Sequence, residues 1–266
     1  MAKQLRKLLL ELGKIMALVK ALVLLQLKGL VRSGHLRKTT LVVMVIMAAA
    51  YTLRLISLQT AFDEYGSPLM GKSLFQEMSI LQAFLITFVL IWFYPQEHVN
   101  SIKGYTIGFP LPELTLRKTI LASTISALIF TGITVSLTLP FFITAFLLGG
   151  VDIEGAARVC LYFMVLGLIT ISLKNFWYGL RSSEILASAL SFLTILVFTA
   201  IKIQADLLTP GGSESIMFHL SIMFSPRPTF IRDSISLIPW SAILGKLLIS
   251  VFLFSVKRSS NPRQDL

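Results

Sequence analysis

Residues that commonly carry enzyme chemistry are scarce in this sequence of 266 residues. It contains one cysteine, Cys160, so no disulfide can form within the chain and no redox compartment can be inferred. Its three histidines, His35, His98 and His219, are too far apart for a usual zinc-binding spacing. No carboxylate pair falls within a long apolar segment, and no nucleophile-elbow motif occurs. We therefore expect no catalytic activity, no metal and no cofactor in this chain.

Acidic residues are also few, 13 against 24 Lys and Arg, which gives a formal net charge of +11. The basic residues lie at the ends of apolar segments and near the N-terminus, not along a stripe suited to nucleic acid, so we expect no nucleic-acid partner. Hydrophobic residues make up 55% of the chain, only 14% is charged, and the mean hydropathy is +0.80. This composition indicates an all-α polytopic membrane protein in contact with membrane lipids.

Residues 1–39 predict a cytoplasmic, interfacial amphipathic helix. Residues 3–34 are rich in leucine but carry seven Lys and Arg, which also exclude a cleavable signal peptide. At about 100° per residue the seven charges project onto one arc of roughly 140°, opposite the leucines. Such a helix is expected to lie in the headgroup plane on anionic lipid. The alternative, a first membrane span over 15–27, is made costly by Lys20 near its middle.

Six apolar segments follow, each near the ~20 residues that a bilayer requires. Lys and Arg number seventeen on one side of them, in the segments 1–39, 95–118, 174–182 and 257–266, and five on the other, which predicts that both termini and these segments are cytoplasmic. We expect a multi-pass protein of the inner (plasma) membrane. Pro140 predicts a kink or break in the third segment. The transmembrane domain then covers 40–256, and 257–266 form a cytoplasmic tail. The predicted spans are 40–60, 74–94, 119–148, 157–175, 184–203 and 236–256.

Two of the segments that connect predicted spans are longer than a simple turn requires. The polar segment 95–118 joins the second and third spans on the cytoplasmic side, and its glycines and prolines predict a short exposed helix followed by a kinked entry into the third span. Such a surface suits a partner, although a solvated turn is the plainer alternative. The external segment 204–235 includes an apolar stretch too short to span, which predicts a re-entrant or interfacial helix.

One nucleotide-binding pattern occurs by coincidence. Residues Gly66 to Ser73 fit G-x-x-x-x-G-K-S, the phosphate-binding loop. That loop acts only between a buried strand and a helix of an α/β domain, whereas here it lies in a short external connection. We expect no nucleotide to bind there.

Three charged residues lie within predicted spans. Arg54 and Glu77 occupy similar depths near the outer ends of the first and second spans, so they could pair. Such a pair would pin two helices together or lie along a substrate path. Lys246 lies well inside the last span, where it would either snorkel or face a cavity or subunit contact.

The order of these elements resembles that of the membrane subunits, or permeases, of ABC type-2 exporters, over nearly the whole chain. Members of that family often carry a glutamate after the second span, then a glycine, a proline-leucine pair and a lysine that opens the third span. Here Glu97, Gly104, Pro110-Leu111 and Lys118 take those places, with a shorter glycine-to-proline interval than in many members.

The resemblance implies that two permease subunits, alike or unlike, form a dimer, and that each docks a separate nucleotide-binding ATPase through the coupling segment 95–118. ATP and Mg would then be bound by the partner. The apolar spans favour an amphipathic, lipidic or peptidic substrate over a small ion. The alternative is a non-transporting membrane scaffold or assembly subunit that recruits a cytoplasmic partner. The candidate partner-binding residues are Glu97, His98, Asn100, Lys103, Gly104, Pro110, Leu111 and Lys118, together with Arg6, Lys7 and Lys14.

Overall fold

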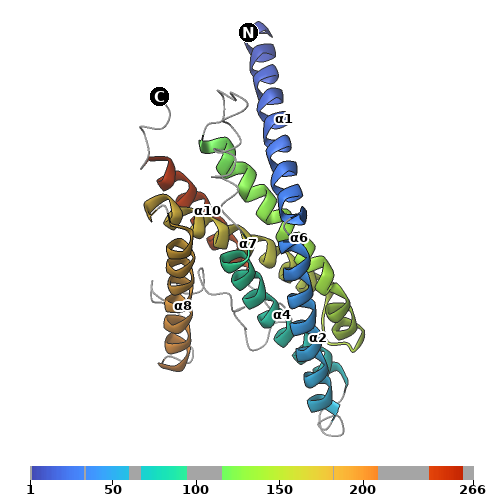
Figure 1. Ribbon diagram of the computed structural model, residues 1–266. Helices are drawn as coiled ribbons and strands as arrows, with labels where there is room; N and C mark the ends of the chain where they lie inside the picture. The colour runs from blue at the N-terminus through green and yellow to red at the C-terminus, as the bar shows by residue number, and fades with distance from the viewer. Residues whose placement is uncertain are drawn as a thin grey trace.

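The computed structural model describes residues 2–32, 34–59, 67–94, 116–181, 183–208 and 240–259. These residues are almost entirely helical, and none of them forms a strand, so the expectation of an all-helical fold is confirmed for this part of the chain. The helices, shown in Figure 1, are α1 (Ala2–Arg32), α2 (His35–Gln59), α4 (Ser67–Trp92), α6 (Leu116–Leu147), α7 (Ile153–Arg181), α8 (Glu184–Leu208) and α10 (Trp240–Ser259).

Four of the described helices are long and apolar enough to cross a membrane. Their candidate spans are Leu36–Ser57, Gly71–Trp92, Leu121–Leu147 and Ile153–Tyr178, in α2, α4, α6 and α7. The described apolar stretches of α8 and α10 are shorter and cover Glu184–Ala200 and Ile243–Leu253. The chain therefore has the helices of a membrane protein.

Helices α4, α6 and α7 form the centre of the bundle. Their apolar side chains make one continuous core, while α2 packs at its edge, and α8 and α10 pack mainly on α7. Many buried positions in the centre carry hydroxyls, and these bond within their own helix: Thr131 donates to Ala127 O at 2.9 Å, and Thr170 donates to Leu166 O at 2.8 Å. Because each such hydroxyl finds a partner one turn away, the membrane interior tolerates it.

Helix α1 packs against the first part of α6. Val19, Leu22 and Val23 are buried against Ala122, whereas Lys20 and Lys28 are exposed. Gly34, at a φ of 70° that side-chain-bearing residues rarely adopt, separates α1 from α2. Figure 1 shows the two helices following one another in nearly the same direction. The expected position of α1 in the headgroup plane stays a prediction.

Of the kink or break predicted at Pro140, the break does not occur, since α6 continues through that residue to Leu147, and the kink stays a prediction. Proline removes one helical hydrogen bond, but in a membrane bundle the neighbouring helices can hold the remaining turns in place. Here Phe142 and Ala145, directly after Pro140, are buried in the core. The helix ends instead at a turn in which Gly149 and Gly150 have positive φ angles of 91° and 81°.

A second correction concerns the fourth predicted span, 157–175, and the cytoplasmic loop 174–182 that was expected to follow it. Helix α7 continues to Arg181, and only residues 182–183 separate it from α8. Lys174 is therefore a buried helical residue and not a loop charge. Without it, the basic residues still number sixteen against five, so the predicted orientation does not change.

The phosphate-loop pattern has a structural explanation. Residues 67–73 belong to the first turns of α4. A Cβ atom added to Gly71 would lie 2.7 Å from the carbonyl oxygen of Ala145, and still closer to that of Gly149. The glycine thus permits a close contact between α4 and the end of α6, and this part of the pattern is helix, not a phosphate-binding loop.

Candidate functional site

Most of the expected partner-binding residues lie outside the described residues. This holds for Glu97, His98, Asn100, Lys103, Gly104, Pro110 and Leu111. Lys118 belongs to α6, and Arg6, Lys7 and Lys14 belong to α1, but the positions of these four side chains are not described. Of the expected re-entrant segment, 204–208 belong to α8 and 209–235 lie outside the described residues, as does most of the tail at 257–266. The described residue that precedes the coupling segment is Tyr94, which makes the end of α4 the part of the structure nearest to it in sequence.

The last turn of α4 has carbonyl oxygens that need donors. The next residue in sequence is Pro95, which has no N–H, so the Ile91 carbonyl lacks its usual donor four residues on. Lys174 of α7 supplies one, because its Nζ donates to Ile91 O at 2.8 Å and to Tyr94 O at 2.7 Å. Ser188 of α8 donates to the same Ile91 oxygen at 2.9 Å. A cation at this position also complements the negative end of the helix dipole.

The charge of Lys174 has a partner at the start of α8. Glu184 Oε1 lies 3.6 Å from Lys174 Nζ, and the glutamate stands in the first turn of α8, where a carboxylate is favoured. The lysine side chain is 1% exposed, so two main-chain oxygens and one carboxylate replace its hydration. This environment can hold a buried ammonium in place.

Tyr94 connects the same point to α6. Its hydroxyl donates to Ser123 O at 3.1 Å and forms a second hydrogen bond with the Ser126 hydroxyl, and its ring packs edge-on against Phe130 at 5.9 Å. The end of α4 is therefore bonded to three other helices. We call this set of residues the α4 anchor: Ile91, Tyr94, Ser123, Ser126, Lys174, Glu184 and Ser188.

Sequence reasoning missed the α4 anchor because it assigned Lys174 to a loop. Two signals pointed the other way. The stretch from 157 to 181 contains no proline, and the residues after Lys174 are mostly apolar or aromatic, which favours a continuing helix. A lysine flanked on both sides by helical apolar sequence then has to be buried or snorkel. Its main-chain partners Ile91 and Tyr94, 83 and 80 residues away in sequence, leave no local signal.

The expected contact between Arg54 and Glu77 is present. Arg54 Nη2 lies 2.6 Å from Glu77 Oε1, and the two side chains are 35% and 43% exposed. Ser57 accepts from Arg54 Nη1 at 3.2 Å, and Ser73 accepts from Nη2 at 3.3 Å. The pair borders an open cavity of about 360 Å³ between α2 and α4, whose other lining residues are Ala50, Leu53, Ser57, Met78 and Leu81. The arrangement suits both roles considered above, a pin between two helices and a polar step on a substrate path.

Lys246 is wholly buried and points toward α7. Its Nζ lies 5.4 Å from the centre of the Tyr162 ring, over the ring face, which is the geometry of a cation–π contact. The side chain is therefore packed against α7 of its own chain and does not snorkel to a surface, and the expected cavity or subunit contact stays a prediction. Among the described residues, no group of three or more His, Cys, Asp or Glu side chains is placed to hold a metal ion.

Comparison with protein-family models, with curated proteins and with solved structures found no match. Inferences about function therefore depend on the residues, on the arrangement above and on the family resemblance of the sequence.

Proposed function

We propose that this chain is the membrane subunit of an ABC-type exporter. In this proposal α2, α4, α6, α7, α8 and α10 are six spans of the inner membrane, α1 lies at its cytoplasmic surface, and both termini are cytoplasmic. The subunit forms a dimer with a like or unlike permease. Its coupling segment 95–118 docks a separate ATPase that binds ATP and Mg, and the exported substrate is amphipathic, lipidic or peptidic.

The α4 anchor is the observation that supports the proposal best. A coupling segment has to pass the movement of an ATPase to the spans, and it can do so only if its ends are firmly attached to them. The anchor joins the end of α4, directly before this segment, to α6 through Tyr94 and to α7 and α8 through Lys174 and Ser188. A push on the segment would therefore move four helices together, which is how a two-state change in packing is driven.

A membrane scaffold is the second candidate function. The same anchor would then hold a docking surface still, and no ATP-driven movement would follow. The two candidates differ in whether nucleotide turnover by the partner depends on this chain.

The experiment replaces residues 97–103 with a Gly/Ser linker of equal length in the full chain, purified with its bound partner. The expected result is loss of ATPase binding, or of its stimulation by this chain, because the polar docking side chains are gone. Residues 60–66, which are also seven in number and are expected on the opposite side, give the matched control when replaced in the same way. An ATPase that stays bound and coupled after the 97–103 change would contradict the proposal, as would transport or ATP hydrolysis by the chain alone.

A further inference from the structure

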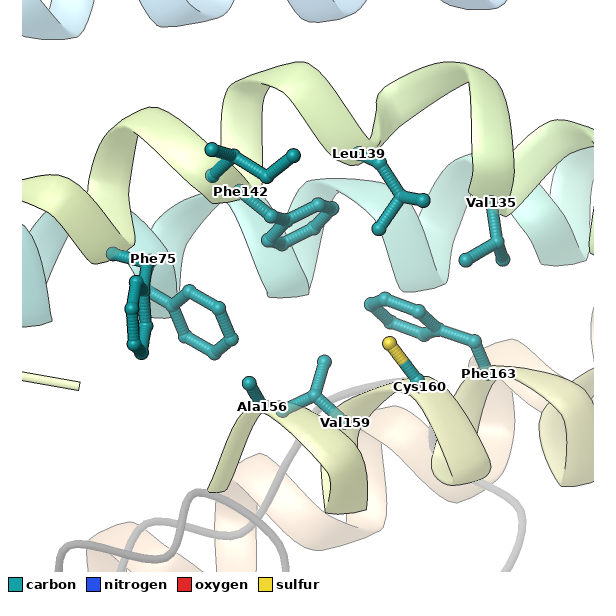
Figure 2. A pocket seen from close by; sticks show the side chains of 10 residues that line it. Phe75, Val135, Leu139, Phe142, Ala156, Val159, Cys160 and Phe163 are labelled. Carbon is teal, nitrogen blue, oxygen red and sulfur yellow. The ribbon is translucent and has the colours of Figure 1, made fainter. Parts of the chain in front are cut away.

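A cavity of about 140 Å³ lies among α4, α6 and α7, the three central helices. Figure 2 shows Val135 and Leu139 on α6 facing Val159 and Cys160 on α7 across this space. Every lining residue is apolar, and the Cys160 thiol is the only heteroatom among the side chains. The lining residues are Phe75, Val135, Leu139, Phe142, Ile143, Phe146, Ala156, Val159, Cys160 and Phe163.

Close helix contacts on two sides keep this space open. Toward one end, α4 meets the end of α6 at Gly71, where an added Cβ would lie 2.7 Å from Ala145 O. Toward the other end, α6 meets α7 at Gly167, where an added Cβ would lie 2.7 Å from Thr131 Oγ1. Between them the Phe142 ring stands 5.4 Å from Phe75 and 6.0 Å from Phe163, and so acts as a spacer. Because these contacts, with backbone atoms at Gly71 and with the Thr131 side chain at Gly167, fix the helix separations, the cavity cannot collapse without breaking them.

Water is a poor occupant of such a space. A buried water needs two to four polar partners, and apolar cavities of about 150 Å³ are known to stay dry and to accept a benzene-sized group. All the lining residues belong to the candidate spans Gly71–Trp92, Leu121–Leu147 and Ile153–Tyr178, so lipid hydrocarbon would surround the cavity in a bilayer. An empty cavity forfeits the dispersion contacts of its lining atoms, and a hydrocarbon group restores them.

We propose that this cavity binds the end of a linear alkyl chain, a few carbons long, since a benzene-sized group fits a cavity of about this volume. The alkyl chain has two possible sources, the acyl tail of a bilayer lipid and the apolar part of a free amphiphile such as a transported substrate. The proposal does not depend on a role in export, because alkyl binding can be measured on the chain without any ATPase.

The test uses the full-length chain in nanodiscs of one phospholipid, a fraction of which carries a diazirine at the end of an acyl chain. After illumination, mass spectrometry maps the crosslinked residues. We expect crosslinks concentrated on the lining segments 135–146 and 156–163, with a several-fold loss in Ala156→Phe, which fills the cavity. Ala157 is the matched control, because it is exposed on the next position of the same helix and Ala157→Phe should keep the crosslinks. Crosslinks spread evenly over the apolar surface, or unchanged by Ala156→Phe, would overturn the proposal.

Cys160 provides a second measurement on the unmodified chain, in case Ala156→Phe does not fold. It is the single cysteine, it is exposed, and it lines the cavity. Dodecanoic acid should slow its alkylation by N-ethylmaleimide several-fold, whereas acetate should not; equal rates with both would count against the site.

The crosslinking test also distinguishes the two sources of the alkyl chain. If excess dodecanoic acid displaces the lipid probe, the occupant is a free amphiphile. Crosslinks that persist identify bilayer lipid, and both outcomes retain an alkyl chain in the cavity.

Discussion

Charged side chains hold α4 at two places, in different surroundings. In its first half, Glu77 pairs with Arg54 of α2, and both side chains remain more than a third exposed. At its end, Lys174 is almost completely buried and donates to two main-chain carbonyl oxygens. Where the open cavity beside it admits water, the Arg54–Glu77 pair gains little over its hydrated state, whereas a buried ammonium bonded to the backbone is costly to disturb. The comparison indicates that α4 is fixed at the end next to the coupling segment and less firmly held by charge in its first half.

The largest effect is expected from Lys174→Met, which removes the buried ammonium and retains most of its apolar volume. Ile91 O and Tyr94 O lose a donor and Glu184 loses its cation, so the free energy of unfolding should fall by about 3 kcal/mol. Denaturant titration of the purified chain in detergent measures this. Lys28→Met, at an exposed position on α1, is the control and should change stability little. Equal stability of the two variants would mean that Lys174 contributes nothing to the stability of the α4 anchor.

Gly71→Ala should have the next largest effect on stability. It tests the first turns of α4, where close packing and not charge holds the helix. The new methyl group would overlap the backbone of Ala145 and Gly149, which cannot rotate away, so we expect a loss of about 2 kcal/mol in the free energy of unfolding. Gly132→Ala in α6 is the matched control, because its Cβ would meet only the flexible Met164 Cε at 3.9 Å. Thermal unfolding of both variants measures the difference. A tolerated Gly71→Ala would show that α4 and α6 can separate at this end.

Replacing Gln82, near the middle of the α4 span, should raise the free energy of unfolding, whereas the two substitutions above should lower it. Its side chain is wholly buried, and within the described residues neither of its amide atoms has a hydrogen-bond partner. Replacing an unsatisfied buried amide with Met should raise the free energy of unfolding by about 1 kcal/mol. Gln76→Met, at a half-buried position on the same helix, is the control. If Gln82→Met instead lowers stability, the amide has a partner that the described residues do not contain. If it raises stability and lowers transport, the amide contacts substrate.

The sequence predicted those parts of the fold that depend on local composition. Each of the six apolar segments coincides, over its described residues, with one helix, because twenty apolar residues in succession favour a helix wherever a bilayer excludes water. The pairing of Arg54 with Glu77 also followed from depth alone, since both lie near the same end of adjacent antiparallel spans.

The α4 anchor and the cavity among α4, α6 and α7 could not be predicted in the same way. Lys174, Ile91 and Ser188 come from three helices, and the cavity exists because Gly71 and Gly167 set the separations of two helix pairs. Periodicity identifies which face of a helix is apolar, but it does not fix the rotation and distance of one helix relative to another. Lysine is also typical of cytoplasmic loops in membrane proteins. For that reason the sequence predicted Lys174 in a loop and not in a buried helical position.

The smallest effect on stability is expected at the Arg54–Glu77 pair. Its two possible roles, a pin between α2 and α4 or a polar contact on a substrate path, are therefore separated by measuring transport. Arg54→Gln and Glu77→Gln should each cost less than about 1 kcal/mol, and a double-mutant cycle should give a coupling of about 0.5 kcal/mol. If the pair only pins α2 to α4, the exchange of both residues, Arg54→Glu with Glu77→Arg, should restore stability and leave transport unchanged.

A substrate path predicts a different result for the same exchange. The cavity beside the pair is open and otherwise lined mainly by apolar residues, so an amphipathic substrate would meet a fixed order of charges there. Reversing that order would then lower transport even where stability is restored. Arg158→Gln is the control, because Arg158 pairs with Glu154 one turn away within α7, and its loss should leave transport at the wild-type rate. A stable exchanged variant that transports normally would assign the pair to helix pinning and limit polar recognition to other residues of the bundle.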